Sequence, residues 1–350
     1  MTSVSDYADL WEPQPGWLNT ASYGLPPRPA WEALQAALGD WRVGATSWEP
    51  WDESTGRARE SFARLVGADA ADVFVGSTVS AAVAPIAAAL PDGAKVLTDD
   101  IEFTSNVFPW MVHADRGVQV VSAPTEHLLD AIKPGLDLVA VSAVQSASGA
   151  VLDLAEVVAA SKEVGALVVI DASQAVGWLP IDVSGVDALI AHTYKWMMTP
   201  RGATLGYLSP ELQERLRPSN AGWYAGREVA TSYYGTAMEL APDARRFDQS
   251  PAWFSYVAAA ESLELIEKIG VETIQQHNVA LANEFRSGLG MAPSDSAIVS
   301  AAVPGADEAF AAAGVRAAAR GGKLRVSFHV YSTSADVQLA LEALDGLQAT

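Results

Sequence analysis

Two stretches, ALVVIDASQAVG at 166–177 and ALIAHTYKWMMTPRG at 188–202, decide the fold. Each is a short apolar run that ends in polar residues, a pattern typical of a buried parallel strand followed by a turn. The same pattern recurs from about residue 60 to 210, with helix-like segments between several runs; the others are DVFVG, AKVLT, VQVVS, DLVAVSA and ATLGYLS. This alternation predicts an α/β fold with a mostly parallel, seven-stranded sheet that is covered by helices.

The rest of the chain predicts a second, smaller domain. A long helical segment at 255–289 is followed by the strand-like KLRVSFHVY at 323–331 and the helix-like SADVQLALEALDGL at 334–347. A chain of 350 residues is also longer than a typical single domain. We expect a large domain over 1–250 and a small C-terminal α+β domain over 251–350, with the N-terminal segment packed on the small domain.

Composition excludes several classes of function. The chain has 42 acidic and 22 basic residues, a formal charge of -20, which disfavours binding to nucleic acid or to an anionic membrane. Neither a signal peptide nor an apolar stretch of about 18 residues is visible, so we expect a cytoplasmic protein. The absence of cysteine excludes disulfides, thiolate metal sites and a cysteine nucleophile. The five histidines show no ligand spacing, so no metal is expected.

Polar residues directly after apolar runs are candidates for a ligand site, because ligands of parallel sheets bind at the carboxyl ends of the strands. Asp171 follows ALVVI; its carboxylate could pair with a protonated pyridine nitrogen, or it could cap the next turn. Lys195 lies among Tyr194, Trp196 and Met197. Burial there would lower the pKa of the amine and favour an imine with an aldehyde; the alternative is a surface lysine with a buried stem.

Two further stretches could bind anions. In VFVGSTVSAAV, at 73–83, Ser77 and Thr78 stand between a strand and an Ala-rich helix, where hydroxyls and free backbone N–H groups suit a phosphate. Helix capping explains either residue equally well. In KLRVSFHVY, Arg325 could bind a carboxylate through two hydrogen bonds, or be an ordinary surface charge on a strand.

The order of these pieces resembles the class V aminotransferase family, which belongs to the fold type I enzymes that use pyridoxal 5'-phosphate (PLP). The family includes cysteine desulfurases, kynureninases and isopenicillin N epimerase-like proteins. The resemblance runs from WLNTASYGLPP at 17–27 to LRVSFHVYSTSADV at 324–337. Its most specific part is DASQAVG followed, at the usual distance, by HTYKWMMTPRG.

The resemblance implies a role for each matching residue. Lys195 carries PLP as a Schiff base, Asp171 pairs with the pyridine nitrogen, and Gln174 binds the phenolic oxygen. The phosphate is held by Ser77, Thr78 and His192. Phe103 occupies the position of a histidine that stacks on the cofactor ring in desulfurases; it could also be a core residue.

The remaining implied roles concern the edges of the site. Either Gln145 or Ser146 lies near the phenolic oxygen. Ser250, in RRFDQSPAWF, reaches the phosphate of a neighbouring subunit, which implies a homodimer with active sites at the subunit interface. The expected substrate is a small amino acid, and the residues around it are Asn19, Ser22, Tyr23 and Arg325.

Several reactions remain open. The persulfide route of desulfurases is excluded because the chain has no thiol, but a C–S lyase, an aminotransferase, an epimerase and a kynureninase-like hydrolase are compatible with the residues. Several segments, HTYKWMMTPRG and NAGWYAGRE among them, look most similar to the lyases of ergothioneine biosynthesis, which cleave hercynylcysteine sulfoxide to ergothioneine, pyruvate and ammonia. Tryptophans could stack on the trimethylated group of that substrate or belong to the core or interface; they are Trp41, Trp48, Trp51, Trp223 and Trp253.

A PLP-binding regulatory module without activity is the non-enzymatic alternative. The retention of Asp171, Gln174, Lys195 and Arg325 together counts against it.

Overall fold

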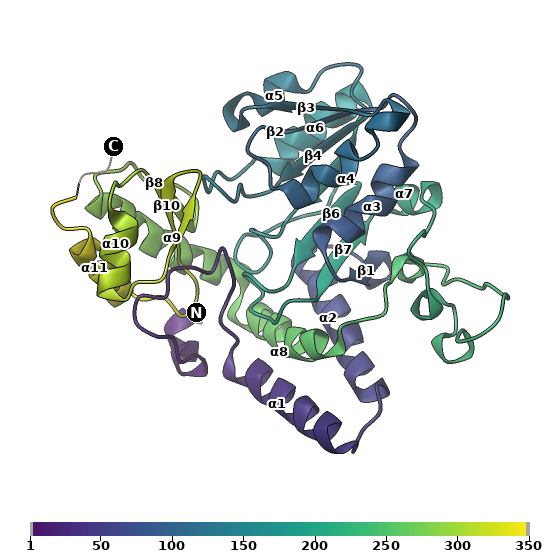
Figure 1. Ribbon diagram of the computed structural model, residues 1–350, viewed down its shortest axis with the longest axis horizontal. Coiled ribbons are helices and arrows are strands. Elements are labelled where there is room, and N and C mark those ends of the chain that lie inside the picture. The colour runs from purple at the N-terminus through teal and green to yellow at the C-terminus, as the bar shows by residue number, and fades with distance from the viewer. Residues whose placement is uncertain (1–2, 348–350) are drawn as a thin grey trace.

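The computed structural model describes residues 3–347 and contains one large and one small sheet (Figure 1). The large sheet has seven strands in the order β1-β7-β6-β5-β4-β2-β3. β7 runs antiparallel to both of its neighbours and the other neighbouring pairs are parallel. The strands are β1 (Val73–Gly76), β2 (Lys95–Asp99), β3 (Gln119–Ala123), β4 (Leu138–Ser142), β5 (Leu167–Asp171), β6 (Ala188–His192) and β7 (Thr204–Leu208). The predicted seven-stranded, mostly parallel sheet is therefore confirmed.

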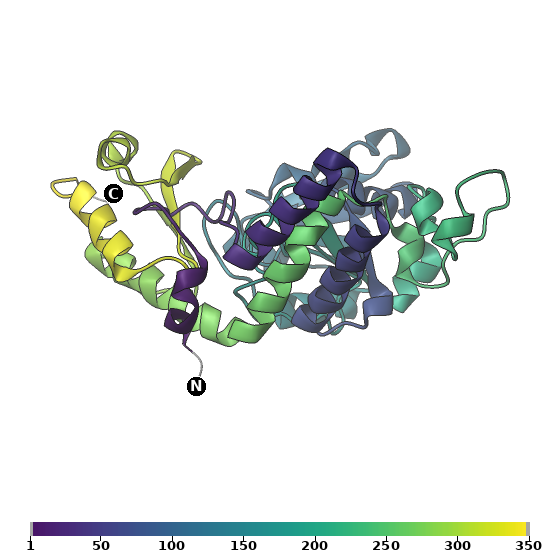
Figure 2. The same ribbon diagram turned by 90° about the horizontal axis from the view of Figure 1, so that it is seen from below.

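Helices cover both faces of this sheet, so its strands are buried on both sides. In β5, Val168 and Ile170 pack on one face while Val169 packs on the other. The first face is covered by α2 (Glu49–Val66), α6 (Leu154–Val164) and α8 (Trp253–Ile269), with α1 (Arg28–Val43) lying beside α8 (Figure 2). The second face is covered by α3 (Val79–Ala89), α4 (Phe108–Met111) and α7 (Pro210–Arg215).

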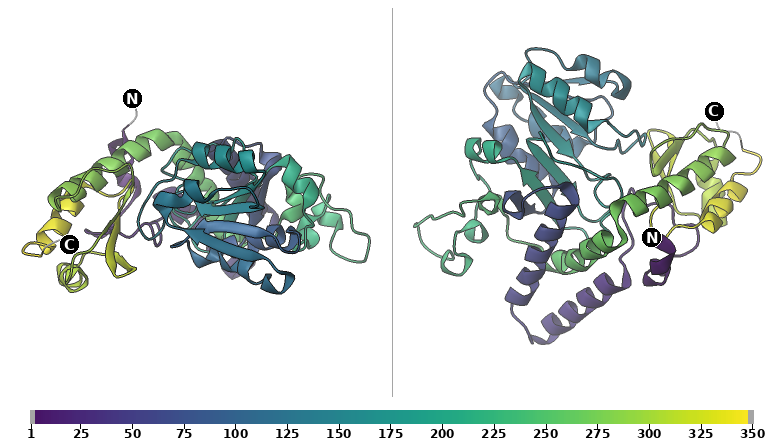
Figure 3. Two further views of the ribbon diagram at one scale, coloured as in Figure 1. Left: turned by 90° about the horizontal axis from the view of Figure 1, so that it is seen from above. Right: turned by 180° about the vertical axis from the view of Figure 1, so that it is seen from behind.

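The segment predicted as one long helix forms two. α8 ends at Ile269 and α9 (Val271–Gly288) begins after Gly270, whose φ of +93° lies in the region that favours glycine. Seen from behind, α8 and α9 run in succession from the large sheet to the small one (Figure 3). The predicted continuous helix is wrong at this glycine because its backbone cannot continue the α-helical path.

The small sheet is antiparallel, with the order β8-β10-β9. Its strands are β8 (Ile298–Ala301), β9 (Ala318–Arg320) and β10 (Lys323–Ser327), and it carries α10 (Ala306–Ala313) and α11 (Ser334–Ala343). The N-terminal segment lies against this part of the chain, through isolated bridges from Trp17 to Arg316 and from Asn19 to Ser327. The proposed domain boundary near residue 250 remains a prediction.

Short helices fill the connections. They are α5 (Leu128–Ala131) and the 3-10 turns η1 (Val4–Leu10), η2 (Ala70–Asp72), η3 (Thr104–Asn106), η4 (Ala114–Arg116), η5 (Thr125–His127), η6 (Trp223–Ala225), η7 (Val229–Thr231) and η8 (Ala244–Phe247). Within residues 3–347, no helix combines the length and apolar character that crossing a bilayer requires.

Candidate active site

Lys195 lies just beyond the carboxyl end of β6, and its side chain is buried. The residue is 8% exposed, so the alternative of a surface lysine is wrong. Its amine lies 5.6 Å from the ring centre of Phe103 and 5.8 Å from that of Tyr194. Burial lowers the pKa of Lys195 to about 8, and the charge of Asp171 acts in the opposite direction. The amine and this carboxylate therefore face one site.

The backbone around Lys195 is held by close packing from distant parts of the chain. A Cβ on Gly24 would lie 2.0 Å from the carbonyl oxygen of Lys195. A Cβ on Gly177 would lie 2.6 Å from the carbonyl oxygen of Trp196, which also pairs with His329 Nε2 at 2.9 Å. Only glycine, which has no Cβ, can lie this close to the carbonyl oxygens of Lys195 and Trp196. Gly24 and Gly177 therefore position the backbone around the lysine.

Asp171 ends β5, the neighbouring strand, and is 6% exposed. Its Oδ1 accepts a hydrogen bond from the backbone N–H of Ser173 at 2.9 Å, so the turn-capping role is real. Within residues 3–347, Oδ2 accepts no hydrogen bond from protein, and this oxygen is available to a ring nitrogen. The two roles proposed for Asp171 are thus compatible.

Gln174 lies between Asp171 and the N-terminal segment. Its Nε2 donates to the carbonyl oxygen of Ala21 at 2.9 Å and to Ser146 Oγ at 3.2 Å, and its Oε1 accepts from Trp196 Nε1 at 2.8 Å. Both amide hydrogens are therefore used within the chain. The role of Gln174 toward a phenolic oxygen remains a prediction.

Ser146, and not Gln145, contacts other predicted site residues. Besides the contact with Gln174, Ser146 Oγ lies 3.1 Å from Arg325 Nη1. Gln145 is 2% exposed and bonds within its own loop, to the backbone N–H of Ala147.

The turn between β1 and α3 carries the residues for which an anion-binding role was predicted. Thr78 caps α3, because its Oγ1 accepts from the backbone N–H of Ala81 at 3.2 Å; the capping alternative is right for this residue. His192 reaches the same helix start, with its Nε2 3.5 Å from the backbone nitrogen of Val79. Burial lowers the pKa of His192 to about 3, so the ring is neutral. A helix N-terminus, hydroxyls and a neutral imidazole together suit a phosphate.

A neighbouring loop also contacts this turn. Ser77 Oγ donates to Gln249 Oε1 at 3.0 Å. Ser250, the next residue, is exposed, and its predicted contact with a neighbouring subunit remains a prediction.

Phe103 is not a core residue. It is 48% exposed, although its ring lies beside the buried amine of Lys195. An exposed aromatic face next to this amine suits stacking on a flat ligand.

Arg325 in β10 is 1% exposed, so it is not a surface charge. Its Nη1 donates to the carbonyl oxygen of Ser146 at 2.8 Å and its Nη2 to Ser22 Oγ at 2.9 Å. Its Nε has no partner, and among residues 3–347 no carboxylate lies within 4.0 Å. Burial, with the nearby charge of Arg320, lowers the pKa of Arg325 to about 10. A buried guanidinium without a counter-ion strongly favours an anionic ligand.

The N-terminal segment supplies the other residues predicted around the substrate. Ser22 touches Arg325 directly, and Asn19 Oδ1 is buried without a hydrogen-bond partner. Tyr23 is 50% exposed and borders a hollow of about 370 Å³ that is also lined by Tyr194 and Arg201. Their roles in substrate binding remain predictions.

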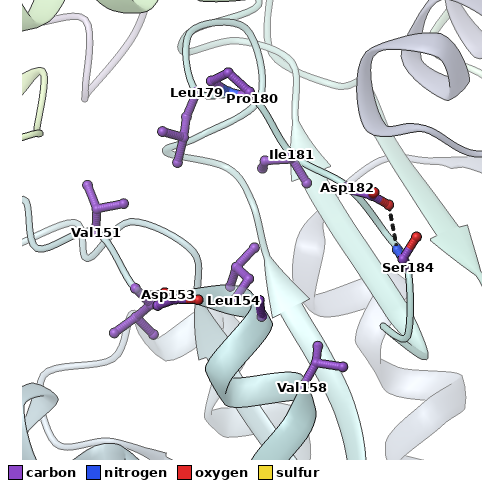
Figure 4. A pocket seen from close by; sticks show the side chains of 11 residues that line it. Val151, Asp153, Leu154, Val158, Leu179, Pro180, Ile181, Asp182 and Ser184 are labelled. Atoms are coloured by element: carbon purple, nitrogen blue, oxygen red, sulfur yellow. Dashed lines mark hydrogen bonds between the residues drawn. The ribbon is translucent and has the colours of Figure 1, made fainter.

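A second hollow of about 370 Å³ lies between the start of α6 and the loop 179–184 (Figure 4). Apolar side chains such as Leu154, Val158 and Ile181 form most of its wall. No predicted site residue lines it, so it is separate from the site around Lys195.

Three residues near the site were missed by sequence reasoning. Glu102 is buried beside Phe103, Gln249 contacts Ser77, and Arg201 stacks on Tyr194 with its guanidinium carbon 4.2 Å from the ring centre. Arg201 and Gln249 stand in stretches that were quoted for other residues, HTYKWMMTPRG and RRFDQSPAWF. No apolar run precedes any of the three directly, so the strand-end pattern does not mark them.

The aminotransferase class-V family model matches residues 52–302, most of the chain. The chain belongs to the class V aminotransferase family. An uncharacterized aminotransferase of Bacillus subtilis, YcbU, is 30% identical over 90% of each chain. The isopenicillin N epimerase of Streptomyces clavuligerus is 28% identical over 94% of each chain.

Solved structures show the same fold. The cystine C-S lyase C-DES, in complex with its product cysteine persulfide, has a TM-score of 0.84 over 96% of this chain and 98% of that one, at 20% identity. A C-DES mutant with glycine covalently linked to the PLP cofactor has a TM-score of 0.85 at 19% identity, over 99% of this chain and 100% of that one.

PLP is therefore the cofactor of this class V enzyme, and the residues fit it. A buried amine without an anionic contact would receive the aldehyde, and the free Oδ2 of Asp171 would receive the ring nitrogen. The start of α3, with His192, would hold the phosphate, and Phe103 would cover the ring.

Proposed function

We propose that this protein is a PLP-dependent C–S lyase that cleaves hercynylcysteine sulfoxide by eliminating a sulfenic acid from Cβ. The remaining fragment hydrolyses to pyruvate and ammonia, and an external thiol reduces the sulfenic acid to ergothioneine. The observation that best supports an amino-acid substrate is the state of Arg325. Its guanidinium is buried, and no carboxylate of the described residues 3–347 pairs with it. A carboxylate is the anion that fits a planar guanidinium best, because it can accept two parallel hydrogen bonds. Ser22 and Ser146 hold Arg325 in place through its Nη atoms.

The bound cofactor supplies an electron sink for the charge that develops at Cα of an amino acid. Lys195 is the base that removes the Cα proton, and the pKa of about 8 makes its neutral form accessible near pH 7. Arg325 orients the substrate through the α-carboxylate, and Asp171 keeps the ring nitrogen protonated. The sulfur group then leaves from Cβ as Lys195 holds the proton.

The absence of a thiol supports elimination over persulfide transfer. The sequence has no cysteine. Before β10, the chain forms a tight hairpin between β9 and β10 through Gly321 and Gly322, with φ values of +55° and +76°. A sulfenate-type leaving group departs without a protein nucleophile, so hercynylcysteine sulfoxide suits such a site.

The tryptophans considered for a quaternary ammonium group pack on one another: Trp48 stacks on Trp253 at 5.5 Å and meets the edge of Trp223 at 5.5 Å. The choice of substrate within the C–S lyases therefore rests on the resemblance of the segments quoted above.

The alternative is a different reaction on an amino acid. The epimerase of Streptomyces clavuligerus matches this chain over almost its full length, and epimerisation needs only a proton returned to the opposite face of Cα. An aminotransferase or a kynureninase-like hydrolase would use the same Lys195 and Arg325.

Incubation of the PLP-loaded protein with hercynylcysteine sulfoxide, alongside a panel of ordinary amino acids, tests the proposal. With an added thiol reductant such as dithiothreitol, which reduces the released sulfenic acid, we expect pyruvate, ammonia and ergothioneine in equal amounts from the sulfoxide, and none with Lys195→Ala. Racemised or transaminated product without pyruvate would instead establish the epimerase or the aminotransferase. A cofactor absorbance that no amino acid changes would favour the regulatory module.

We also propose that the protein acts as a homodimer in which Ser250 contacts the phosphate held by its partner. Ser250 is exposed and follows the loop that contacts Ser77. Sedimentation should give twice the monomer mass. Mixing Lys195→Ala with Ser250→Asp protomers should restore about a quarter of the activity, because half of the heterodimer sites would then be intact. A monomeric active enzyme would contradict the proposal.

A further inference from the structure

A second carboxyl group lies buried at the cofactor site. Glu102 follows β2 and is 8% exposed. Its Oε2 accepts from the backbone N–H of Ser142 at 2.7 Å. Its Oε1 lies 2.5 Å from Ser142 Oγ and accepts from the backbone N–H of Phe103 at 2.9 Å. Among residues 3–347 no cation lies within 4.0 Å of this carboxyl, so only neutral donors hold it.

The contact with Ser142 places Glu102 next to Asp171. Ser142 ends β4 and is the register partner of Asp171, which ends β5. Glu102 therefore links the segment after β2 to β4. This strand lies next to β5, which ends at Asp171, the carboxylate expected at the ring nitrogen. The row of side chains at this edge of the sheet is Glu102, Ser142 and Asp171.

The contact with Phe103 links Glu102 to the other side of the cofactor. Phe103 is 48% exposed. Its backbone is held beside Lys195 by the hydrogen bond from its N–H to Glu102 and by the bond that its carbonyl oxygen accepts from the Asn106 N–H at 2.8 Å. Loss of the bond to Glu102 would leave the ring freer to move from the cofactor.

The pKa of Glu102 lies near neutral pH because opposing effects act on its carboxyl group. Burial raises the pKa of Glu102 to about 7, and the charge of Asp171 raises it too, while the donated hydrogen bonds lower it. The other carboxyl groups nearby belong to the same segment: Asp99 accepts hydrogen bonds from Thr125 Oγ1 and from the backbone of Ile101, and Asp100 is exposed. Lys195, on which the charge of Asp171 acts, is the buried amine of the same site.

We propose that Glu102 is a positioning residue of the cofactor site: it fixes Phe103 over the cofactor ring, and its charge adds to that of Asp171 in holding the proton on the ring nitrogen. The second effect is electrostatic, because an additional negative charge in a poorly solvated site favours the protonated ring. The proposal concerns PLP alone and does not depend on which substrate the enzyme cleaves.

Three variants separate the two effects. Glu102→Gln keeps the size of the side chain and one hydrogen-bond acceptor but cannot ionise. Glu102→Ala removes both restraint and charge. Glu126→Gln, at an exposed glutamate, is the matched control. Each protein is titrated with PLP, and the absorbance of bound PLP is followed from pH 5.5 to pH 8.5, with no substrate present.

We expect PLP affinity to fall by about fivefold in Glu102→Gln and by about tenfold or more in Glu102→Ala, because one and then all of the hydrogen bonds are lost. The wild-type absorbance should change with a midpoint near pH 7, and this change should disappear in Glu102→Gln and persist in Glu126→Gln. In an Asp171→Asn background, Glu102→Gln should have a smaller spectral effect than in the wild type.

Wild-type affinity together with a wild-type pH titration in Glu102→Gln would overturn the proposal. If Glu102→Ala does not fold, the Gln variant alone decides it. Lower affinity in Glu102→Gln with an unchanged titration would reduce Glu102 to a purely structural contact and would contradict the electrostatic part.

Discussion

At the scale of single residues, burial determines the chemistry of Lys195. The pKa of about 8 lies below the ordinary value of 10.5 because the amine has left water. The neutral amine reacts with the aldehyde, so covalent attachment of PLP to the cofactor-free protein should accelerate as pH rises and level off above about pH 8. Stopped-flow absorbance measures this rate; a plateau reached only above pH 10 would contradict the burial of the amine.

The same shift affects stability. Folding favours the neutral amine, so the unfolded chain binds more protons between pH 8 and pH 10.5, and stability of the cofactor-free protein rises with pH through that window. Below pH 8, Lys195→Met should therefore unfold at a higher temperature than the wild type, with a gain of about 1–2 kcal/mol. Lys133→Met, at an exposed lysine, serves as the control.

Arg325 permits a prediction about substrate binding. Arg325→Ala should raise KM for amino acids by roughly 10- to 100-fold, since hydrogen bonds to a charged group contribute about 1.5–3 kcal/mol. Arg325→Lys should recover only part of the loss because an ammonium cannot form the bidentate pair. Steady-state kinetics check both, with Arg64→Ala as a surface control that leaves KM unchanged. Unchanged KM in Arg325→Ala would remove this residue from the site.

At the scale of elements, the start of α3 combines two tasks that one substitution can separate. Asp caps helices as well as Thr, so Thr78→Asp should leave the melting temperature of the cofactor-free protein nearly unchanged. Its charge would repel the phosphate, and PLP affinity should fall by about tenfold or more. Thr78→Asn keeps the cap without the charge and should bind PLP almost normally. Equal affinity for the Asp and Asn variants would place the phosphate elsewhere.

The elements themselves were predictable to different degrees. The seven strands follow apolar runs because a parallel strand covered on both faces needs apolar side chains at every position. The division between α8 and α9 was missed because apolar residues keep their helical spacing on both sides of Gly270. That spacing gives no information about the backbone angle φ of Gly270, which is +93°. Short irregular elements such as η3, which follows Phe103, were not predicted, because they form through contacts with other elements and have no local apolar pattern.

At the scale of the whole molecule, the N-terminal segment packs against the backbone of Lys195. Gly24→Ala should shift the Lys195 backbone, because the new Cβ would lie 2.0 Å from the Lys195 carbonyl oxygen. We expect weaker PLP binding and a lower melting temperature. Gly39→Ala, in α1 with no atom within 4 Å, should instead stabilise by about 0.5–1 kcal/mol. Normal PLP binding by Gly24→Ala would mean that the segment can move away from the lysine.

A buried ion pair ties α2, β1 and the segment before α8 together. Arg59 in α2 bonds Asp248 Oδ2 at 2.7 Å, and Asp248 Oδ1 accepts from the backbone of Val75 in β1. Arg59→Met should destabilise by about 3–5 kcal/mol because it leaves a buried, unpaired carboxylate. Adding Asp248→Asn should recover part of this loss in urea unfolding. Arg57→Met breaks only exposed pairs and should cost less than about 1 kcal/mol.

By itself the sequence determined the sheet and the family, and it predicted the pair Lys195 and Asp171, because apolar runs and the residues that end them are local in the chain. Only the tertiary structure decided that Arg325 is buried without a counter-ion, since its partners Ser146 and Ser22 lie 179 and 303 residues away. The structure also showed that Ser146, and not Gln145, contacts other predicted site residues, and that the Phe103 side chain is exposed. It identified the buried Glu102, which sequence reasoning had missed. Burial and charge balance arise from segments that folding brings together, and no local pattern records them.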